Sequence, residues 1–311
     1  MLKSIPNQKI ELPILNDHEI ELYIKREDLL HPQISGNKFR KLKYNIQEAK
    51  RLNMDTILTF GGAYSNHIAA TAAAGNYYGF KTIGIIRGEE LANDLEKTLK
   101  TNTTLAFAKE HGMELHFISR SEYKRKETTE FIETLKEKFN PFYLVPEGGT
   151  NDLAVKGCQE ILTTEDDSFD IICCAVGTGG TISGLINSAK AHQKVIGFPA
   201  LKENYLHEEI TKKTNSNSWY LNRKHHLGGY AKYNEELISF MNNFYKTQNI
   251  LLDPIYTGKM LMGILQEIRD NSFSKKTRIL AVHTGGLQGI AGINTKLKNK
   301  SATLIKTTHE I

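Results

Sequence analysis

The chain has 311 residues, 40% of them hydrophobic and 24% charged, which is ordinary for a globular protein of one large or two medium domains. Its formal net charge of +5 is spread over stretches where basic and acidic residues alternate, and no nucleic-acid-binding motif accompanies them. No apolar run approaches the roughly 18 residues that span a bilayer, and residues 1–13 contain no signal-peptide core. We therefore expect a cytoplasmic protein that binds neither nucleic acid nor a membrane.

Apolar segments of strand length alternate with helical patterns along the chain. Such alternation is typical of βαβ units, so it predicts an α/β fold with open, mostly parallel sheets flanked by helices. In chain order the expected strands are 21–25, 56–60, 82–87, 114–118, 171–176, 195–198 and 279–283. The expected helices are 38–52, 66–74, 93–111, 122–139, 153–163, 181–190, 235–247 and 259–269.

Two stretches interrupt this pattern. Pro-Glu-Gly-Gly-Thr-Asn at 146–151 is a turn sequence and predicts the break between two halves of the chain. Residues 202–232 are polar, include Trp219 and several tyrosines, and show no clear period, so no element is expected there.

The three cysteines, Cys158, Cys173 and Cys174, have a spacing that fits neither a zinc site nor a disulfide framework. Cys173 and Cys174 are adjacent in an apolar segment that is typical of a buried strand. We therefore expect reduced, buried thiols and no bound metal.

The first motif that could carry chemistry is Gly-Asn-Lys at 36–38, where a loop enters an expected helix. A cation at a helix start opposes the helix dipole, so this position lowers the pKa of Lys38. A lysine that forms a Schiff base needs such a lowered pKa. A surface lysine near Glu27 and Asp28 is the commoner role, so Lys38 alone decides nothing.

The second motif, Gly-Gly-Ala-Tyr-Ser-Asn-His at 61–67, precedes an alanine-rich helix. Ser65 is a natural N-cap, and the N–H groups that follow it could also hold a carboxylate. Taken alone, capping is the better-supported role of Ser65. His67 alone is more often a hydrogen-bonded residue of a helix start than a catalyst.

The third motif is a glycine-rich turn at 177–181, between an expected strand and an expected helix. Its free backbone N–H groups and the positive end of the helix dipole suit a phosphate. Ile182 stands where a dinucleotide fingerprint has its third glycine, and no Gly-Lys-Ser/Thr of a Walker loop follows. Close packing explains the glycines equally well, so both roles stay open.

Together with Lys-Arg-Glu-Asp at 25–28, the three motifs resemble, in this order, the fold-type-II enzymes that use pyridoxal 5'-phosphate (PLP). The chain is most similar to the branch that holds 1-aminocyclopropane-1-carboxylate (ACC) deaminase and D-cysteine desulfhydrase. The resemblance covers residues 20–292 and includes two further segments, 253–259 and 283–286.

The resemblance implies a two-domain α/β architecture like that of the tryptophan synthase β subunit, with PLP between the domains. Residues 39–147 would form the smaller domain. Residues 1–38 plus 148–311 would form the larger, PLP-binding domain. Enzymes of this kind are usually homodimers that act on a small amino-acid substrate.

Carried over by position, the resemblance also implies roles for single residues. Lys38 would bind PLP as a Schiff base and act as a catalytic residue, together with Ser65 and Tyr256. Contacts to the cofactor would come from Lys38, Asn66, Gly177, Thr178, Gly179, Gly180, Thr181 and Thr284, and contacts to the substrate from Ser65, Asn66, His67, Tyr256 and Thr257.

Two positions separate the activities of this branch. ACC deaminases resemble each other in carrying Glu after the active-site tyrosine and Leu before the glycine pair, whereas this chain has Thr257 and Thr284, like D-cysteine desulfhydrases. A neutral hydroxyl at the ring nitrogen of PLP leaves a weaker electron sink, which suffices to expel a good leaving group such as thiolate. The resemblance therefore favours β-elimination, in particular the conversion of D-cysteine to pyruvate, ammonia and sulfide.

Two alternatives remain open. One is ACC deaminase activity, since Ile-Ala-Ala follows Ser-Asn-His where many relatives have a polar residue, which leaves the substrate undecided. The other is a non-catalytic sensor that binds a small amino acid in the cleft between the domains. The intact Lys38 argues against a sensor, because a pure binding protein does not require a nucleophilic amine.

Overall fold

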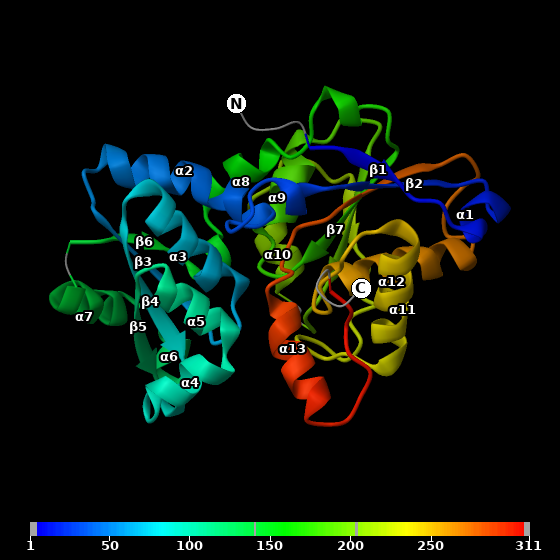
Figure 1. Ribbon diagram of the computed structural model, residues 1–311. Helices are drawn as coiled ribbons and strands as arrows, with labels where there is room; N and C mark the ends of the chain where they lie inside the picture. Colours follow the sequence, from blue (N-terminus) through cyan, green and yellow to red (C-terminus); the bar gives the residue numbers. More distant parts are fainter. Residues whose placement is uncertain (1–4, 140, 203–204, 308–311) are drawn as a thin grey trace.

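The computed structural model describes residues 5–139, 141–202 and 205–307, whose strands form two separate sheets (Figure 1). Neighbouring strands run parallel, except for one antiparallel pair at the edge of the larger sheet. The larger sheet has the order β1 (Asn7–Lys9), β2 (Glu21–Lys25), β10 (Arg278–Val282), β7 (Ile171–Val176), β8 (Lys194–Pro199) and β9 (Trp219–Leu221). The smaller sheet has the order β5 (Met113–Ile118), β4 (Lys81–Arg87), β3 (Thr56–Gly62) and β6 (Tyr143–Val145). The expected α/β fold is confirmed.

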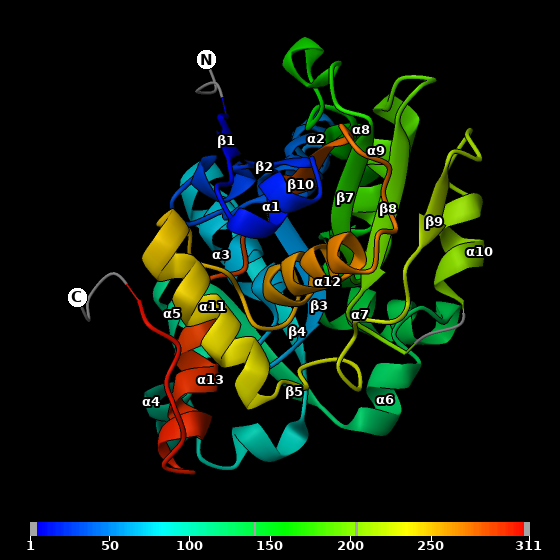
Figure 2. The same ribbon diagram turned by 90° about the vertical axis from the view of Figure 1, so that its right-hand side faces the viewer.

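Helices flank both sheets, because parallel strands need long crossover connections. The helices of the described chain are α1 (Pro13–Asp17), α2 (Asn37–Arg51), α3 (Asn66–Tyr78), α4 (Leu95–Thr101), α5 (Thr103–Glu110), α6 (Arg120–Lys124), α7 (Thr129–Phe139), α8 (Asp152–Gln159), α9 (Gly180–Ser188), α10 (Leu206–Thr211), α11 (Glu235–Gln248), α12 (Thr257–Arg269) and α13 (Gly289–Lys298). Figure 1 shows α3, α5 and α7 around the smaller sheet, and Figure 2 shows α11 beside α12 in the other half. Helix α2 packs against both α3 and α8, so it joins the two halves.

The central strands are buried on both faces, as parallel strands covered by helices must be. In β7 the two cysteines illustrate this, because Cys173 faces one apolar cluster of the larger half and Cys174 faces the other. All three cysteines are buried and free, as the sequence predicts. Along the described chain no helix is both long enough and apolar enough to cross a membrane.

All seven expected strands are present, but two expected helices are wrong as single helices. The helix expected at 93–111 breaks at Asn102, whose backbone is extended and whose side chain accepts a hydrogen bond from the Leu105 backbone N–H at 3.0 Å. The helix expected at 122–139 is likewise split into α6 and α7. The sequence did not predict α1, α10, α13 or the three-residue strands β1, β6 and β9.

Because Asn102 is buried and caps α5, its replacement tests the break between α4 and α5. We expect Asn102→Ala to lower the free energy of unfolding by about 1 kcal/mol, since the Leu105 N–H loses its partner. Asn102→Asp keeps an acceptor at this position and should lose much less. Urea denaturation followed by circular dichroism measures both variants, and an Asn102→Ala protein as stable as wild type would contradict the capping role.

Candidate active site

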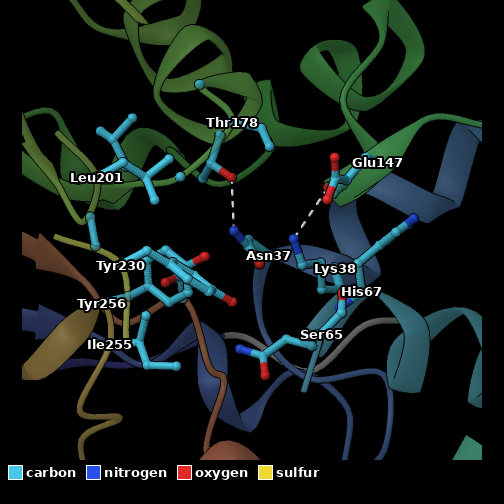
Figure 3. A pocket seen from close by; sticks show the side chains of 18 of the residues that line it. Asn37, Lys38, Ser65, His67, Glu147, Thr178, Leu201, Tyr230, Ile255 and Tyr256 are labelled. Atoms are coloured by element: carbon cyan, nitrogen blue, oxygen red, sulfur yellow. Dashed lines mark hydrogen bonds between the residues drawn. The ribbon is translucent and has the colours of Figure 1, made fainter. Parts of the chain in front are cut away.

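A cavity of about 450 Å³ lies between the two sheets (Figure 3). Its wall includes the last residues of three strands, Gly62 of β3, Arg87 of β4 and Val176 of β7, and Thr284, which follows β10. The carboxyl ends of the parallel strands therefore open onto one space. Ligand sites of open α/β folds lie at this edge of a sheet.

The sequence-predicted site residues converge on this cavity, with two exceptions. Gly180 and Thr257 do not line it. The predicted residues that do line it are Lys38, Ser65, Asn66, His67, Gly177, Thr178, Gly179, Thr181, Tyr256 and Thr284.

The glycine-rich turn forms a cradle of backbone between β7 and α9. Gly179 has φ +87°, which only glycine adopts easily, and it precedes the first residue of α9. A Cβ atom on Gly177 would lie 3.2 Å from the Tyr256 ring, and one on Gly180 would lie 3.0 Å from the Thr150 side chain. The missing side chains thus keep the backbone accessible at a helix N-terminus, which is the geometry that holds a phosphate.

Lys38 enters the cavity from the first turn of α2, and its Nζ donates to the Gly148 carbonyl at 3.2 Å. One helical turn later, Lys41 is 2% exposed and donates to the same carbonyl at 3.0 Å and to Thr150 Oγ1 at 2.9 Å. Desolvation, followed by the charge of Lys41, holds the pKa of Lys38 well below its usual value. Lys38 therefore has a neutral, nucleophilic amine more readily than an exposed lysine does.

Lys41 is a site residue that the sequence analysis missed. Its Nζ also lies 3.4 Å from Thr178 Oγ1 and 3.2 Å from the place of a Cβ on Gly180, so this buried cation sits against the glycine cradle. Desolvation lowers the pKa of Lys41 as well. The spacing of three residues from Lys38 was the available signal, because residues i and i+3 share one face of a helix.

Ser65 caps α3, since its Oγ accepts hydrogen bonds from the backbone N–H groups of His67 at 3.2 Å and Ile68 at 3.4 Å. His67 is 1% exposed and its Nε2 lies 2.8 Å from Thr59 Oγ1. Because the Thr59 hydroxyl donates to the Val145 carbonyl, His67 must donate through Nε2. Desolvation and the charges of the two lysines hold the pKa of His67 well below its usual value, so the ring is neutral.

Asn66 has its amide fixed from the opposite half of the molecule. Its Oδ1 accepts a hydrogen bond from Gln288 Nε2 at 2.8 Å. A Cβ on Gly286 would lie 2.7 Å from its Nδ2, so only a glycine leaves room for this amide. The orientation of Asn66 in the cavity wall is therefore set by residues that follow β10.

Thr257, for which the sequence predicts a substrate contact, does not line the cavity. Thr257 is fully buried at the start of α12, and its hydroxyl donates to the Asp253 carboxylate at 2.8 Å. Asp253 also accepts hydrogen bonds from the backbone N–H groups of Ile255, Tyr256 and Thr257. The helix start turns Thr257 inward, so it supports Tyr256 without reaching the cavity.

Tyr256 shares its side of the cavity with Tyr230, a second residue that the sequence analysis missed (Figure 3). The two ring centroids are 6.3 Å apart. Burial, and then the proximity of Tyr230 and Asp253, raises the pKa of Tyr256 well above its usual value, which keeps its phenol protonated at neutral pH. Tyr230 comes from the stretch 202–232, whose lack of period gave no signal.

The donors around this cavity fit PLP. A glycine cradle with a buried ammonium group suits its phosphate, and a second amine of lowered pKa suits a carbonyl carbon. The chain matches the family model described as "Pyridoxal-phosphate dependent enzyme" over residues 4–285. The protein therefore belongs to the PLP-dependent enzymes, and its cofactor is pyridoxal 5'-phosphate.

Relatives place it more closely, in the ACC deaminase and D-cysteine desulfhydrase family. It is 33% identical over 297 residues, 87% of this chain and 73% of the relative, to "Bifunctional D-cysteine desulfhydrase/1-aminocyclopropane-1-carboxylate deaminase, mitochondrial" of Arabidopsis thaliana. It is 31% identical to the "Putative 1-aminocyclopropane-1-carboxylate deaminase" of Thermotoga maritima, over 95% of this chain and 98% of the relative. A solved "ACC deaminase homologue" superposes with a TM-score of 0.78 at 28% identity, over 96% of this chain and 94% of the other. The family expected from the sequence is confirmed.

The geometry of Lys41 predicts that it stabilises bound PLP through the phosphate. We expect Lys41→Met to raise the dissociation constant of PLP roughly 10- to 100-fold, because the phosphate loses one hydrogen bond between charged groups. Lys41→Arg should retain part of the affinity. Equilibrium dialysis of the apoenzyme against PLP measures the constant.

Lys43→Met is the matched control, because the Lys43 ammonium pairs with Glu160 outside the cavity. It should bind PLP as wild type does. Equal affinities of Lys41→Met and Lys43→Met would show that Lys41 does not support the phosphate.

Proposed function

We propose that this enzyme catalyses β-elimination on a small amino acid, most closely D-cysteine, which it converts to pyruvate, ammonia and sulfide. The observation that carries the proposal is the Lys38 amine of lowered pKa, which shares one cavity with Ser65 and with the protonated phenol of Tyr256. The names of the relatives point to the same branch of chemistry.

The cofactor would be held by the backbone of residues 177–181 and by Lys41 at its phosphate, and by Asn66 at its ring oxygen. Thr284, which lines the cavity, would face its ring nitrogen. We further propose that Lys38 carries PLP covalently. When bound, PLP supplies an electron sink for the carbon that loses a proton.

The side chains of Lys38, Ser65 and Tyr256 would transfer the protons of the reaction. The Lys38 amine would take the α-proton, since a lowered pKa leaves it free to act as a base. The Ser65 oxygen already accepts two backbone N–H groups, which leaves its own hydrogen to donate toward the cavity. The phenol of Tyr256 would then donate a proton to the departing sulfur.

The proposal that favours β-elimination over ACC deamination now depends on Thr284 alone, because Thr257 does not reach the cavity. Thr284 is 8% exposed and lies opposite the Lys38 loop, where the Asn37 backbone N–H donates to its carbonyl at 3.2 Å. ACC deamination is the second candidate, which the name of the Thermotoga maritima relative supports.

Three further expectations belong to the same proposal. The two sheets support a smaller domain at 39–147 and a larger domain at 1–38 plus 148–311, the outermost residues of which lie outside the described chain. Free, buried cysteines support a reducing, cytoplasmic location. A homodimer would agree with other enzymes of this fold.

Covalent attachment of the cofactor has a direct test. Reduction of the purified holoenzyme with borohydride should fix PLP on Lys38, and peptide mass spectrometry should find the label there. Lys41 is the internal control, because its amine lies in the same cavity and its pKa is lowered less than that of Lys38. A label on Lys41, or no label, would contradict the assignment of Lys38.

The choice between the two activities is tested by the rates of 2-oxo acid formation from D-cysteine, L-cysteine, β-chloro-D-alanine and ACC. We expect D-cysteine or the chloro compound to react faster than ACC. Thr284→Leu should move the ratio of rates toward ACC, and Thr284→Val, which removes only the hydroxyl, separates hydrogen bonding from size. A wild-type enzyme that turns over ACC fastest would show that the proposed substrate is wrong.

A further inference from the structure

Tyr230 reaches the cavity from an irregular loop, residues 222–234, which joins β9 to α11. The residue is 44% exposed, and its ring contacts that of Tyr256. Four nearby residues have positive φ angles, namely Leu227, Gly228, Gly229 and Ala231. Two of these are not glycine, and such a backbone persists only where its surroundings hold it.

The support next to Tyr230 is Lys259 of α12. Lys259 is 3% exposed, and its Nζ donates to the Gly229 carbonyl at 2.8 Å and to the His226 carbonyl at 3.0 Å. Gly229 is the residue directly before Tyr230. The ammonium group thus bridges two carbonyls of the turn that delivers the tyrosine.

Lys259 is an unusual choice for a purely structural role. In the described chain no carboxylate lies within 4.0 Å of its ammonium group, and burial lowers its pKa to about 8 against the opposing charge of Asp253. A buried lysine without an acidic partner destabilises the fold, so we expect its position to have a function. The loop already has a second anchor at its start, where His225 Nε2 lies 3.0 Å from Glu267 Oε1.

The position of Lys259 on its helix suggests that this function is to hold Tyr230. Tyr256 stands at the start of α12, and Lys259 follows three residues later. One rigid helix therefore holds Tyr256 directly and Tyr230 through the two carbonyls, with the ring centroids 6.3 Å apart.

We propose that Lys259 is a positioning residue that fixes the hydroxyl of Tyr230 beside that of Tyr256, where the two phenols meet the leaving group of the substrate. The kinetic test of this inference rests on the proposed function, because it measures the rate of β-elimination. A misplacement of a reacting group by about 1 Å can lower the rate by roughly 100-fold. Holding Tyr230 in place can therefore offset the cost of burying the Lys259 ammonium group.

The decisive experiment is a double-mutant cycle on the holoenzyme with Lys259→Met, Tyr230→Phe and the combined variant. We expect Lys259→Met to lower kcat on the order of 10- to 100-fold, with a much smaller change in KM and with full PLP content. In the Tyr230→Phe background the same change should lower kcat less than about threefold, because residues that act through one group are not additive. Lys259→Arg, which keeps a charged donor, should restore part of kcat.

Lys25→Met is the matched control for the loss of a buried lysine, because Lys25 pairs with Asp166 away from the cavity. It should lower thermal stability and leave kcat per folded enzyme unchanged. An equal effect of Lys259→Met with and without the Tyr230 hydroxyl would overturn the proposal. So would full activity of either Lys259→Met or Tyr230→Phe.

Hydrogen exchange of the loaded enzyme gives a readout that needs no turnover. Lys259→Met should speed the exchange of backbone amides at 226–231 while those of α12 stay protected. If wild type forms no 2-oxo acid from any amino acid tested, the proposed function fails, but this measurement still tests Lys259. Unchanged exchange at 226–231 would show that Lys259 does not hold the loop.

Discussion

Two buried lysine amines that share one carbonyl oxygen are the electrostatic constraint on which this site depends. Lys38 and Lys41 both donate to the Gly148 carbonyl, and neither has an ion pair within the described chain. Desolvation lowers the pKa of both amines, and the charge of Lys41 lowers that of Lys38 further. Around the lowered pKa values the folded state therefore binds fewer protons than the unfolded chain and gains stability as pH rises. A dianionic phosphate relieves the same cost at neutral pH, which couples cofactor binding to stability. The cavity is thus arranged for an anion, and the nucleophilicity of Lys38 follows from the same arrangement.

Close approach of backbone keeps these groups in place. Gly36, with φ +57°, lies so near the Thr284 carbonyl that any side chain at this position would collide with it. The loop that carries Lys38 is therefore pressed against the segment after β10. On the other wall, Gly286 leaves room for the Asn66 amide, which Gln288 orients. Gly36, which precedes α2, and Gly286, which follows β10, thus allow the close backbone contacts that set the positions of Lys38 and Asn66.

A feature of this structure could be predicted where it has a clear local sequence pattern, and was missed where it depends on contacts between distant residues. The strands Ile171–Val176 and Glu21–Lys25 were predicted with their correct bounds, since apolar segments between turn sequences are a strong pattern. Most of the site residues predicted from the sequence line the cavity. They could be predicted because the order of the motifs resembles a known family, whereas each motif alone left its role open. Asn102 splits an otherwise continuous helical pattern by a single side-chain bond, and Thr257 turns inward at a helix start. Tyr230 depends on a loop whose shape is held by a distant lysine, so no local pattern could reveal it.

The cavity is lined by groups that are held in two different ways, and this bears on how one family supports more than one activity. The place proposed for the phosphate consists of the backbone of residues 177–181 with the buried Lys41 beside it. The wall that carries Tyr230 and Tyr256 consists of side chains, and Asp253 and Lys259 hold the backbone beside them through hydrogen bonds. We expect a change at Asp253 or Lys259 to shift a phenol while the backbone of the cradle stays in place. Because the supports lie outside the cavity, substrate choice in this fold is expected to vary with residues that touch neither substrate nor PLP.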